Sequence, residues 1–252
     1  MTARLKTLAL ALVGPLLLWG CVITAGKFLS TLASGADRSF AFTYVGEVYA
    51  VDLGKEFSKS MGSGGTTGSE SSDGAGEAPA KADKIAWQDG ADAKAEDTDR
   101  KNRAIAEALG KEAGYRKVEY VGGGKFLIDY AISGSLTHGF VYPFNSDAEI
   151  IFPFIAIELR GADRVRVRAP AFGANAGGKN GMDMPGGDGL AAKIDGSFTL
   201  TTDAEIVSQN NENGATTAAD GRKVIAWKAT PTTKDAPLAV LKVAALKVAA
   251  LK

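Results

Sequence analysis

The chain has 252 residues, in which 29 lysines and arginines balance 29 aspartates and glutamates, with one cysteine and one histidine. A single cysteine excludes a disulfide framework, and one cysteine with one histidine is too little for a zinc site of the usual ligands. A formal net charge of zero argues against a nucleic-acid-binding surface over the whole chain. We expect no metal, no other cofactor and no nucleic-acid partner.

Residues 1–20 are expected to form a lipoprotein signal peptide. Arg4 and Lys6 precede an apolar run at 7–19, and Gly20 stands directly before Cys21. A basic start, an apolar stretch of about 7–15 residues and a small residue at its end are typical of a secretory signal. The end of the run also resembles a bacterial lipobox, in which the cysteine is lipidated and becomes the new N-terminus. Cys21 is therefore the predicted lipidation site.

Two other interpretations of this start stay open. The apolar character continues to Gly26, so residues 7–26 could form an uncleaved anchor of about 20 residues, long enough to span a bilayer. The third interpretation is a buried helix with an ordinary core cysteine. The first two place the remaining chain in the cell envelope, facing the periplasm, with the outer membrane favoured over the inner. Residues 21–38 are then expected to be a tether.

The next segments predict a strand, a flexible insertion and a helix. Residues 39–51 alternate apolar and polar side chains, which is the period of a half-buried strand. Residues 62–80 contain six glycines, four serines and no large apolar residue, so a flexible insertion is expected there. Residues 97–112 predict the main helix, because acidic and hydroxyl capping residues precede it and Gly114 follows it.

Two hairpins are predicted after the helix. Residues 115–121 and 125–133 flank three glycines, and residues 149–160 and 164–170 flank a short turn. In the second hairpin, pairing residue 160 with residue 164 places the charged side chains on one face and the apolar side chains on the other, as a half-buried antiparallel pair requires. One face then holds Glu158, Arg160, Arg164 and Arg166, and the other holds Ile157, Leu159, Val165 and Val167.

The last third predicts a second flexible insertion at 173–189, followed by strands at 197–208, 223–230 and 237–243. Residues 241–252 repeat Leu-Lys-Val-Ala-Ala, for which a helical or frayed tail is expected. Together these elements predict a single α+β domain over residues 39–252. It would consist of a mostly antiparallel sheet built from hairpins, one main α-helix, and the N-terminal signal or anchor helix.

Two features could carry a function. Nine of the chain's 20 aromatic residues lie between Tyr115 and Phe154, which favours a sheet core but also fits a pocket for an acyl chain. Arg164, Arg166 and Arg168 follow strand spacing, with Arg160 nearby. They fit either a solvated sheet face partly paired with Glu158, or a contact for lipid head-group phosphates, which guanidinium groups bind through two hydrogen bonds.

No catalytic residues are predicted. Ser135 and His138 are close in the sequence, but no acidic residue that could orient the histidine is evident beside them. An envelope hydrolase with an unrecognised active site is therefore kept only as the alternative function. The main prediction is a non-enzymatic protein that binds lipid or a protein partner.

Several stretches resemble a family of uncharacterised predicted lipoproteins of the proteobacterial envelope. They are GCVITAGKF at 20–28, FAFTYVGE at 40–47, DYAISGSLTHGFVYPF at 129–144, VRVRAPAF at 165–172 and the strands from 195 onward. The final strands, with Trp227, also show a fainter similarity to a mycobacterial lipoprotein domain associated with lipid handling. These resemblances imply an envelope lipoprotein and no assigned reaction.

Overall fold

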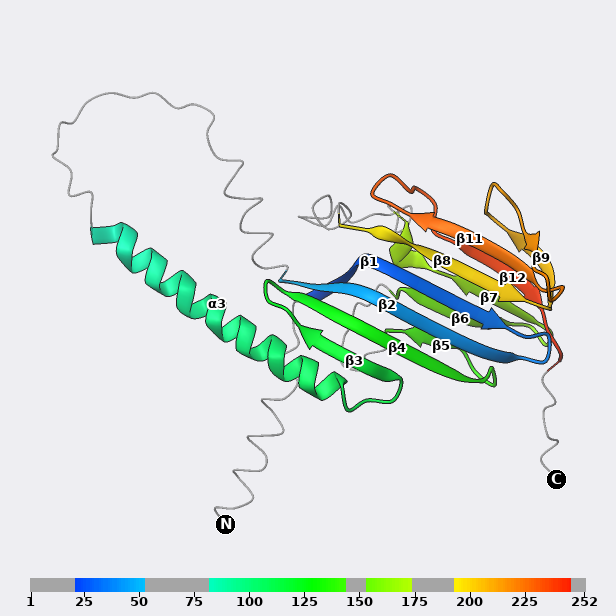
Figure 1. The fold of residues 1–252 in the computed structure, drawn as a ribbon, viewed down its shortest axis with the longest axis horizontal. Helices are drawn as coiled ribbons and strands as arrows, with labels where there is room; N and C mark the ends of the chain where they lie inside the picture. The colour runs from blue at the N-terminus through cyan, green and yellow to red at the C-terminus, as the bar shows by residue number, and fades with distance from the viewer. Residues whose placement is uncertain (1–20, 53–81, 144–152, 174–192, 246–252) are drawn as a thin grey trace, which may run out of the picture.

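A computed structural model of the chain describes residues 21–52, 82–143, 153–173 and 193–245. Two β-sheets pack face to face, and one long helix lies beside the larger sheet (Figure 1). The larger sheet has seven strands in the order β10-β11-β8-β1-β2-β4-β3, and the smaller has five in the order β5-β6-β7-β12-β9. All described strand pairs are antiparallel except β1 with β8, which run parallel.

The bounds of the elements follow the two sheets. The seven-stranded sheet contains β1 (Cys21–Ser34), β2 (Ser39–Asp52), β3 (Tyr115–Tyr120), β4 (Lys125–Ser135), β8 (Asp195–Thr202), β10 (Thr216–Thr217) and β11 (Lys223–Ala229). The five-stranded sheet contains β5 (Phe140–Tyr142), β6 (Ile155–Arg160), β7 (Arg164–Arg168), β9 (Glu205–Gln209) and β12 (Leu238–Lys242). The helices are α3 (Ala82–Leu109) and a 3-10 turn, η2 (Pro170–Phe172).

The core lies between the two sheets and is largely aromatic. Phe42 and Tyr44 point inward from β2 and are fully buried, while Tyr142 and Phe154 come from the five-stranded side. The ring centroids of Phe42 and Tyr142 are 5.2 Å apart, and those of Tyr44 and Phe154 are 5.3 Å apart. Such pairs add about 0.5–1.5 kcal/mol each beyond the apolar area they bury. This α+β arrangement agrees with the predicted class, although the strands form two sheets and not one.

Helix α3 covers the β3 edge of the seven-stranded sheet. Ala106 is buried against it, and Asn102 Nδ2 donates a hydrogen bond to the Tyr120 hydroxyl at 3.3 Å. The helix begins 15 residues before the predicted start at 97 and ends at residue 109. Gly114 then reverses the chain with φ +92, where a side chain would strike the Tyr130 ring.

The predicted tether at 21–38 is wrong, because Cys21–Ser34 forms strand β1 between β2 and β8. Inward and outward side chains alternate along it: Phe28 and Leu32 are buried, and Leu29 is exposed. Two inward positions are occupied by serines, Ser30 and Ser34, which hide the apolar period in the sequence. The strand also contains a β-bulge between Ala25 and Phe28 that shifts this period by one residue.

The strand predicted at 197–208 is divided between the two sheets. Strand β8 ends at Thr202, and β9 begins at Glu205 in the other sheet. Thr202 makes this corner, because its hydroxyl donates to the Ser34 carbonyl at 2.6 Å and accepts from the Ala204 amide at 3.0 Å. The apolar alternation runs through the corner without a break, so the sequence gives no sign of it.

The predicted tail at 241–252 is wrong at its start, since Leu241 and Lys242 are the last residues of β12. Leu241 and Val243 are buried, and the Val243 amide donates to the Asp163 carbonyl at 2.7 Å. The signal or anchor helix, the insertion at 62–80, residues 174–189 of the second insertion and the end of the tail lie outside the described residues. Within the described ranges, no helix combines the length and apolar character needed to cross a bilayer.

Buried Arg38 holds the two sheets together at the end where β1 meets β2. Its guanidinium donates to three backbone carbonyls: Ala244 at 2.5 Å, Ala162 at 2.6 Å and Leu136 at 3.3 Å. The turn after β6 and the residues after β12 are therefore held at the Ala36 end of β1, far from Cys21. The Ala244 amide adds a direct bond to the Ala36 carbonyl at 2.7 Å.

Candidate functional site

The β6–β7 hairpin has the predicted register. Arg160 pairs with Arg164, Glu158 with Arg166 and Ala156 with Arg168. Because alternate side chains of a strand point to opposite faces, the charged residues project from the outer face of the five-stranded sheet. The partners on the inner face, Ile157, Val165 and Val167, are buried in the core.

Lys242 and Glu205 extend this charged surface onto the next two strands. Lys242 of β12 pairs with Arg164, and Glu205 of β9 pairs with Lys242. We name the whole set the arginine face. Its members are Glu158, Arg160, Arg164, Arg166, Arg168, Glu205 and Lys242.

Glu158 is the centre of the arginine face. Its Oε2 accepts hydrogen bonds from Arg166, with the shorter at 2.6 Å, and from Arg160. Its Oε1 lies 3.1 Å from Arg168 Nε as an ion pair without the angle of a hydrogen bond. Glu158 thus pairs with three arginines, as the interpretation of a partly paired sheet face anticipated. Arg164 makes no ion pair among the described residues.

Positive charge remains in excess on this face. Five cations stand against two carboxylates, and Lys242, Arg164 and Arg160 occupy directly paired positions on three adjacent strands. Only Lys242 among these three approaches Glu205, at 3.8 Å. Like charges directly opposite each other weaken a sheet by a fraction of a kcal/mol, about 0.2–1 per pair. An anion bound over this row would relieve that repulsion.

The dense aromatic region forms the sheet core and not a pocket. Tyr130 and Tyr142 lie 4.3 Å apart by ring centroid, and Tyr115 packs against Tyr130 at 4.9 Å. Burial raises the pKa of Tyr115 to about 12 and that of Tyr142 well above its ordinary value. These rings fill the space that an acyl chain would need. Phe144 and Phe152, which belong to the same region of the sequence, lie outside the described residues.

Ser135 and His138 lie in exposed positions near the end of β4. The His138 ring bonds the Thr137 hydroxyl at 3.1 Å, and Ser135 pairs with Ser39 in the sheet. Among the described residues, no hydrogen bond joins Ser135 to His138, and no three His, Cys, Asp or Glu residues gather as a metal site. The hydrolase alternative gains no geometric support from these contacts.

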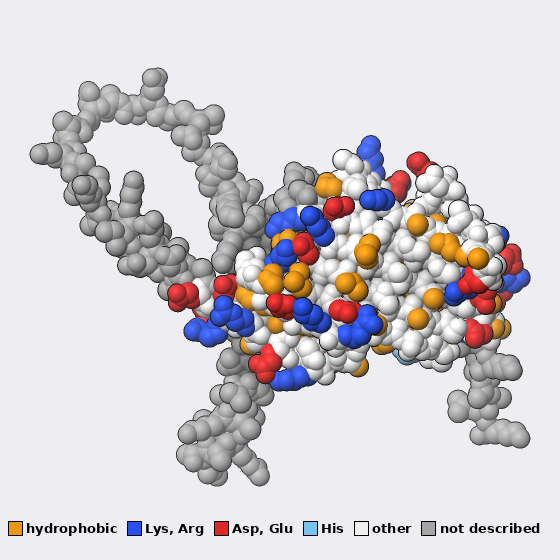
Figure 2. Space-filling view, viewed as in Figure 1, with side chains coloured by type: hydrophobic (Ala, Val, Ile, Leu, Met, Phe, Trp, Pro, Cys, Tyr) orange, Lys and Arg blue, Asp and Glu red, His pale blue; other side chains and the backbone are white. Residues whose placement is uncertain are grey.

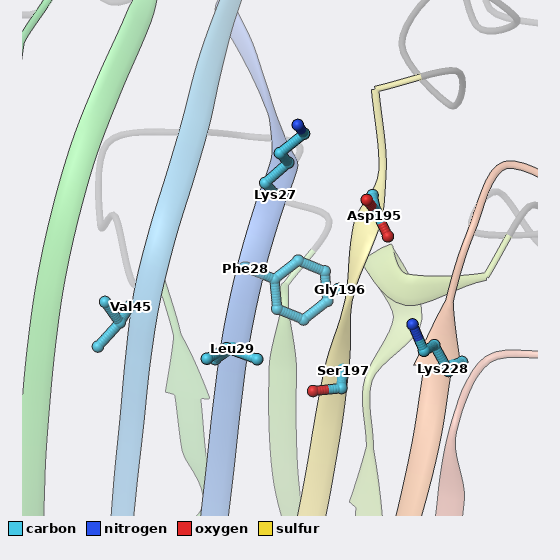
Figure 3. A pocket seen from close by; sticks show the side chains of 8 residues that line it. All are labelled: Lys27, Phe28, Leu29, Val45, Asp195, Gly196, Ser197 and Lys228. Atoms are coloured by element: carbon cyan, nitrogen blue, oxygen red, sulfur yellow. The ribbon is translucent and has the colours of Figure 1, made fainter.

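A surface hollow of about 390 Å³ lies on the outer face of the seven-stranded sheet, where sequence reasoning predicted nothing. Leu29, Val45 and Phe28 form its apolar part, and Lys27 and Lys228 stand at its rim (Figure 3). These residues come from β1, β2 and β11. Recognising 21–34 as a strand is the one signal that would have placed Leu29 on an outer face.

Comparisons with known proteins add little to this geometry. No family model and no curated protein matches the chain. Among solved structures, the folded domain of LppM from Mycobacterium tuberculosis, determined by NMR, matches 88% of this chain and 92% of its own length. Its sequence is 13% identical and the TM-score is 0.30. That likeness is too weak to support a fold or a function, so the resemblance to proteobacterial envelope lipoproteins stays a prediction.

Proposed function

We propose that the protein is a non-enzymatic lipoprotein, tethered in the cell envelope through Cys21 and facing the periplasm, which binds phosphate-bearing ligands through the arginine face. The observation that carries the binding role is the cation row across β6, β7 and β12. Two guanidinium groups and an ammonium group occupy paired positions; Glu158 pairs with Arg160, Glu205 lies 3.8 Å from Lys242, and Arg164 has no ion pair among the described residues. Phosphate accepts the parallel hydrogen bonds that guanidinium groups offer.

The start of β1 favours lipidation over an uncleaved anchor. Because Cys21 is already in a strand, an apolar helix beginning at residue 7 could extend only to residue 20. About 20 residues are needed to span the hydrocarbon core. Palmitate-analogue labelling of cells that express the wild-type chain or Cys21→Ala tests the anchor. Equal labelling of the two chains would remove the lipoprotein assignment.

Vesicle co-sedimentation tests the ligand. The chain from residue 21 with Cys21→Ser retains every strand and helix that the structure describes. It should bind phosphatidylglycerol vesicles, and Arg160→Gln with Arg164→Gln should weaken this binding. The matched control is Arg100→Gln with Arg103→Gln, since both arginines are exposed on helix α3 and belong to neither sheet. A control pair that weakens binding equally would refute a specific role for the arginine face.

Two additional measurements distinguish which kind of anionic ligand the arginine face binds. If inorganic phosphate competes with the vesicles, a small phosphate group is sufficient for binding. Binding to a polyglutamate peptide without binding to phosphatidylglycerol would replace the lipid ligand with an acidic protein partner. Absence of binding in every arm would refute the proposed binding role.

A further inference from the structure

Cys21 has no linker between it and the sheet. It is the first residue of β1 and pairs with Asp52 at the end of β2. An acyl group on Cys21, on which this inference rests, would bring that end of the seven-stranded sheet directly to the bilayer surface. The sheet therefore has little freedom to move away from the membrane, and its nearest outer surface is fixed by the strand geometry.

That nearest surface contains an exposed apolar pair. Leu29 is 64% exposed and Val45 is 46% exposed, and the two are directly paired between β1 and β2. Leu29 is eight residues from Cys21, which is about 26 Å along a strand. Both side chains stand beside the hollow on the outer face (Figure 3).

Unpaired lysines lie on the same outer face as the apolar pair, and Asp129, the strand partner of Val45, is itself paired with Arg116. Lys27, Lys193 and Lys228 are exposed and make no ion pair among the described residues, while Asp195 is the acid that lines the hollow. The ammonium group of Lys193 lies 4.1 Å from the centre of the Tyr49 ring. In the space-filling view, lysine and arginine side chains lie toward the left, where β1 begins, with aspartate and glutamate side chains between them (Figure 2). We name Lys27, Leu29, Val45, Lys193 and Lys228 the Leu29 surface.

We propose that the Leu29 surface lies against an anionic bilayer when Cys21 is acylated. Aliphatic side chains inserted at the headgroup level and lysines near anionic phosphates are the usual composition of such a contact. A tyrosine at the interface is equally typical. Charge complementarity and the position of the acylated residue therefore point to the same occupant.

The arginine face then points away from the same membrane. It lies on the other sheet, and the turn between Arg160 and Arg164 is held at the opposite end of β1 by the Arg38 bond to Ala162. The phosphate-bearing ligand would therefore approach from the aqueous side. The Leu29 surface would hold the protein on its membrane while the arginine face binds the phosphate-bearing ligand.

Photocrosslinking of the full chain tests this orientation. A benzophenone amino acid replaces Leu29 in one variant and Val207 of β9 in the control, whose side chain is 43% exposed on the other sheet. After reconstitution in dilute vesicles of phosphatidylglycerol and phosphatidylcholine, where the arginine face meets no second vesicle, lipid adducts are expected at position 29 and not at 207. In a background of Lys27→Gln and Lys228→Gln, the adduct at 29 should fall, by about fivefold for each lysine.

Failure of the proposed orientation can be distinguished from failure of the proposed lipid anchor, because mass spectrometry measures the acylation of Cys21 independently. Adducts at 207 in place of 29 on the acylated chain would overturn the orientation and leave the anchor intact. Adducts at 29 on a chain with an unmodified Cys21 would support the Leu29 surface and overturn the anchor. Equal adducts at both positions would overturn the orientation.

Discussion

Replacing Glu158 with glutamine tests whether the arginine face serves binding or stability alone, because the two roles predict different outcomes. The carboxylate pairs with Arg160, Arg166 and Arg168, and these side chains are between 28% and 51% exposed. Ion pairs of that exposure contribute about 0.2–1 kcal/mol each, so losing the shared carboxylate should lower the free energy of unfolding by about 1 kcal/mol.

The same substitution removes one of the two carboxylates that reduce the positive potential of the face. One more net positive charge beside an anionic surface adds about 1 kcal/mol to binding, which is about fivefold in affinity. Glu158→Gln is therefore expected to be less stable in urea and yet to bind phosphatidylglycerol vesicles more tightly. Both quantities are measured on the same preparation of the chain from residue 21.

Glu107→Gln is the matched control, because it removes one carboxylate of helix α3 that pairs with Lys111, outside both the arginine face and the Leu29 surface. It changes the net charge equally but leaves the arginine face unaltered, so its vesicle affinity should change far less. If Glu158→Gln binds no more tightly than this control, the arginines are structural partners of Glu158 and the proposed binding role is refuted.

Gly46→Ala should destabilise the fold by more than about 2 kcal/mol in urea titrations, because its Cβ would lie 2.6 Å from the backbone Cα of Phe28. Gly123→Ala has open space but φ +59, so a loss of about 1–2 kcal/mol is expected from backbone strain alone. Glu47 has a pKa lowered chiefly by its hydrogen bond from Lys125. Its contribution to stability should be present above the unfolded pKa of about 4.3 and lost as pH falls through the lower folded pKa. Melting curves from pH 2.5 to 7 should therefore show a smaller acid loss in Glu47→Gln than in wild type. Burial raises the pKa of Tyr115 to about 12, so the unfolded chain releases this proton first and stability should fall as pH rises above about 10; Tyr115→Phe should reduce that alkaline loss.

The arginines of β6 and β7 could be predicted from the sequence because their key contacts are local, whereas Lys242 and Glu205 join the arginine face only through the long-range pairings of β12. Glu158 and Arg166 are eight residues apart around a three-residue turn, and one pairing satisfies the apolar and charged sets together. The Leu29 surface could not be predicted in this way. It joins β1 and β2 with β11 through β8, which pairs with β1 across more than 150 residues of sequence. No short pattern encodes such pairings, because they depend on long-range packing.

Strand β1 and the corner at Thr202 are absent from the sequence predictions for local reasons. Strand β1 was hidden by inward-facing serines, one of which, Ser30, satisfies its hydroxyl with the Thr43 carbonyl at 3.1 Å. The chain crosses between sheets at Thr202 without losing its alternation, so a period of two could not reveal the corner. In each case a polar side chain bonds to the backbone of another strand, which the local sequence pattern does not reveal.

The place of β12 bears on how the chain acquires its structure. This strand comes from residues 238–242, yet it lies between β7 and β9 and is the only described partner of β9. The five-stranded sheet therefore cannot be completed until residues 238–242, near the end of the chain, are present. For a protein that crosses a membrane unfolded, as an envelope lipoprotein would, this order delays folding until export is nearly complete. Removing the last 15 residues should leave a chain that is exported but never becomes protease-resistant.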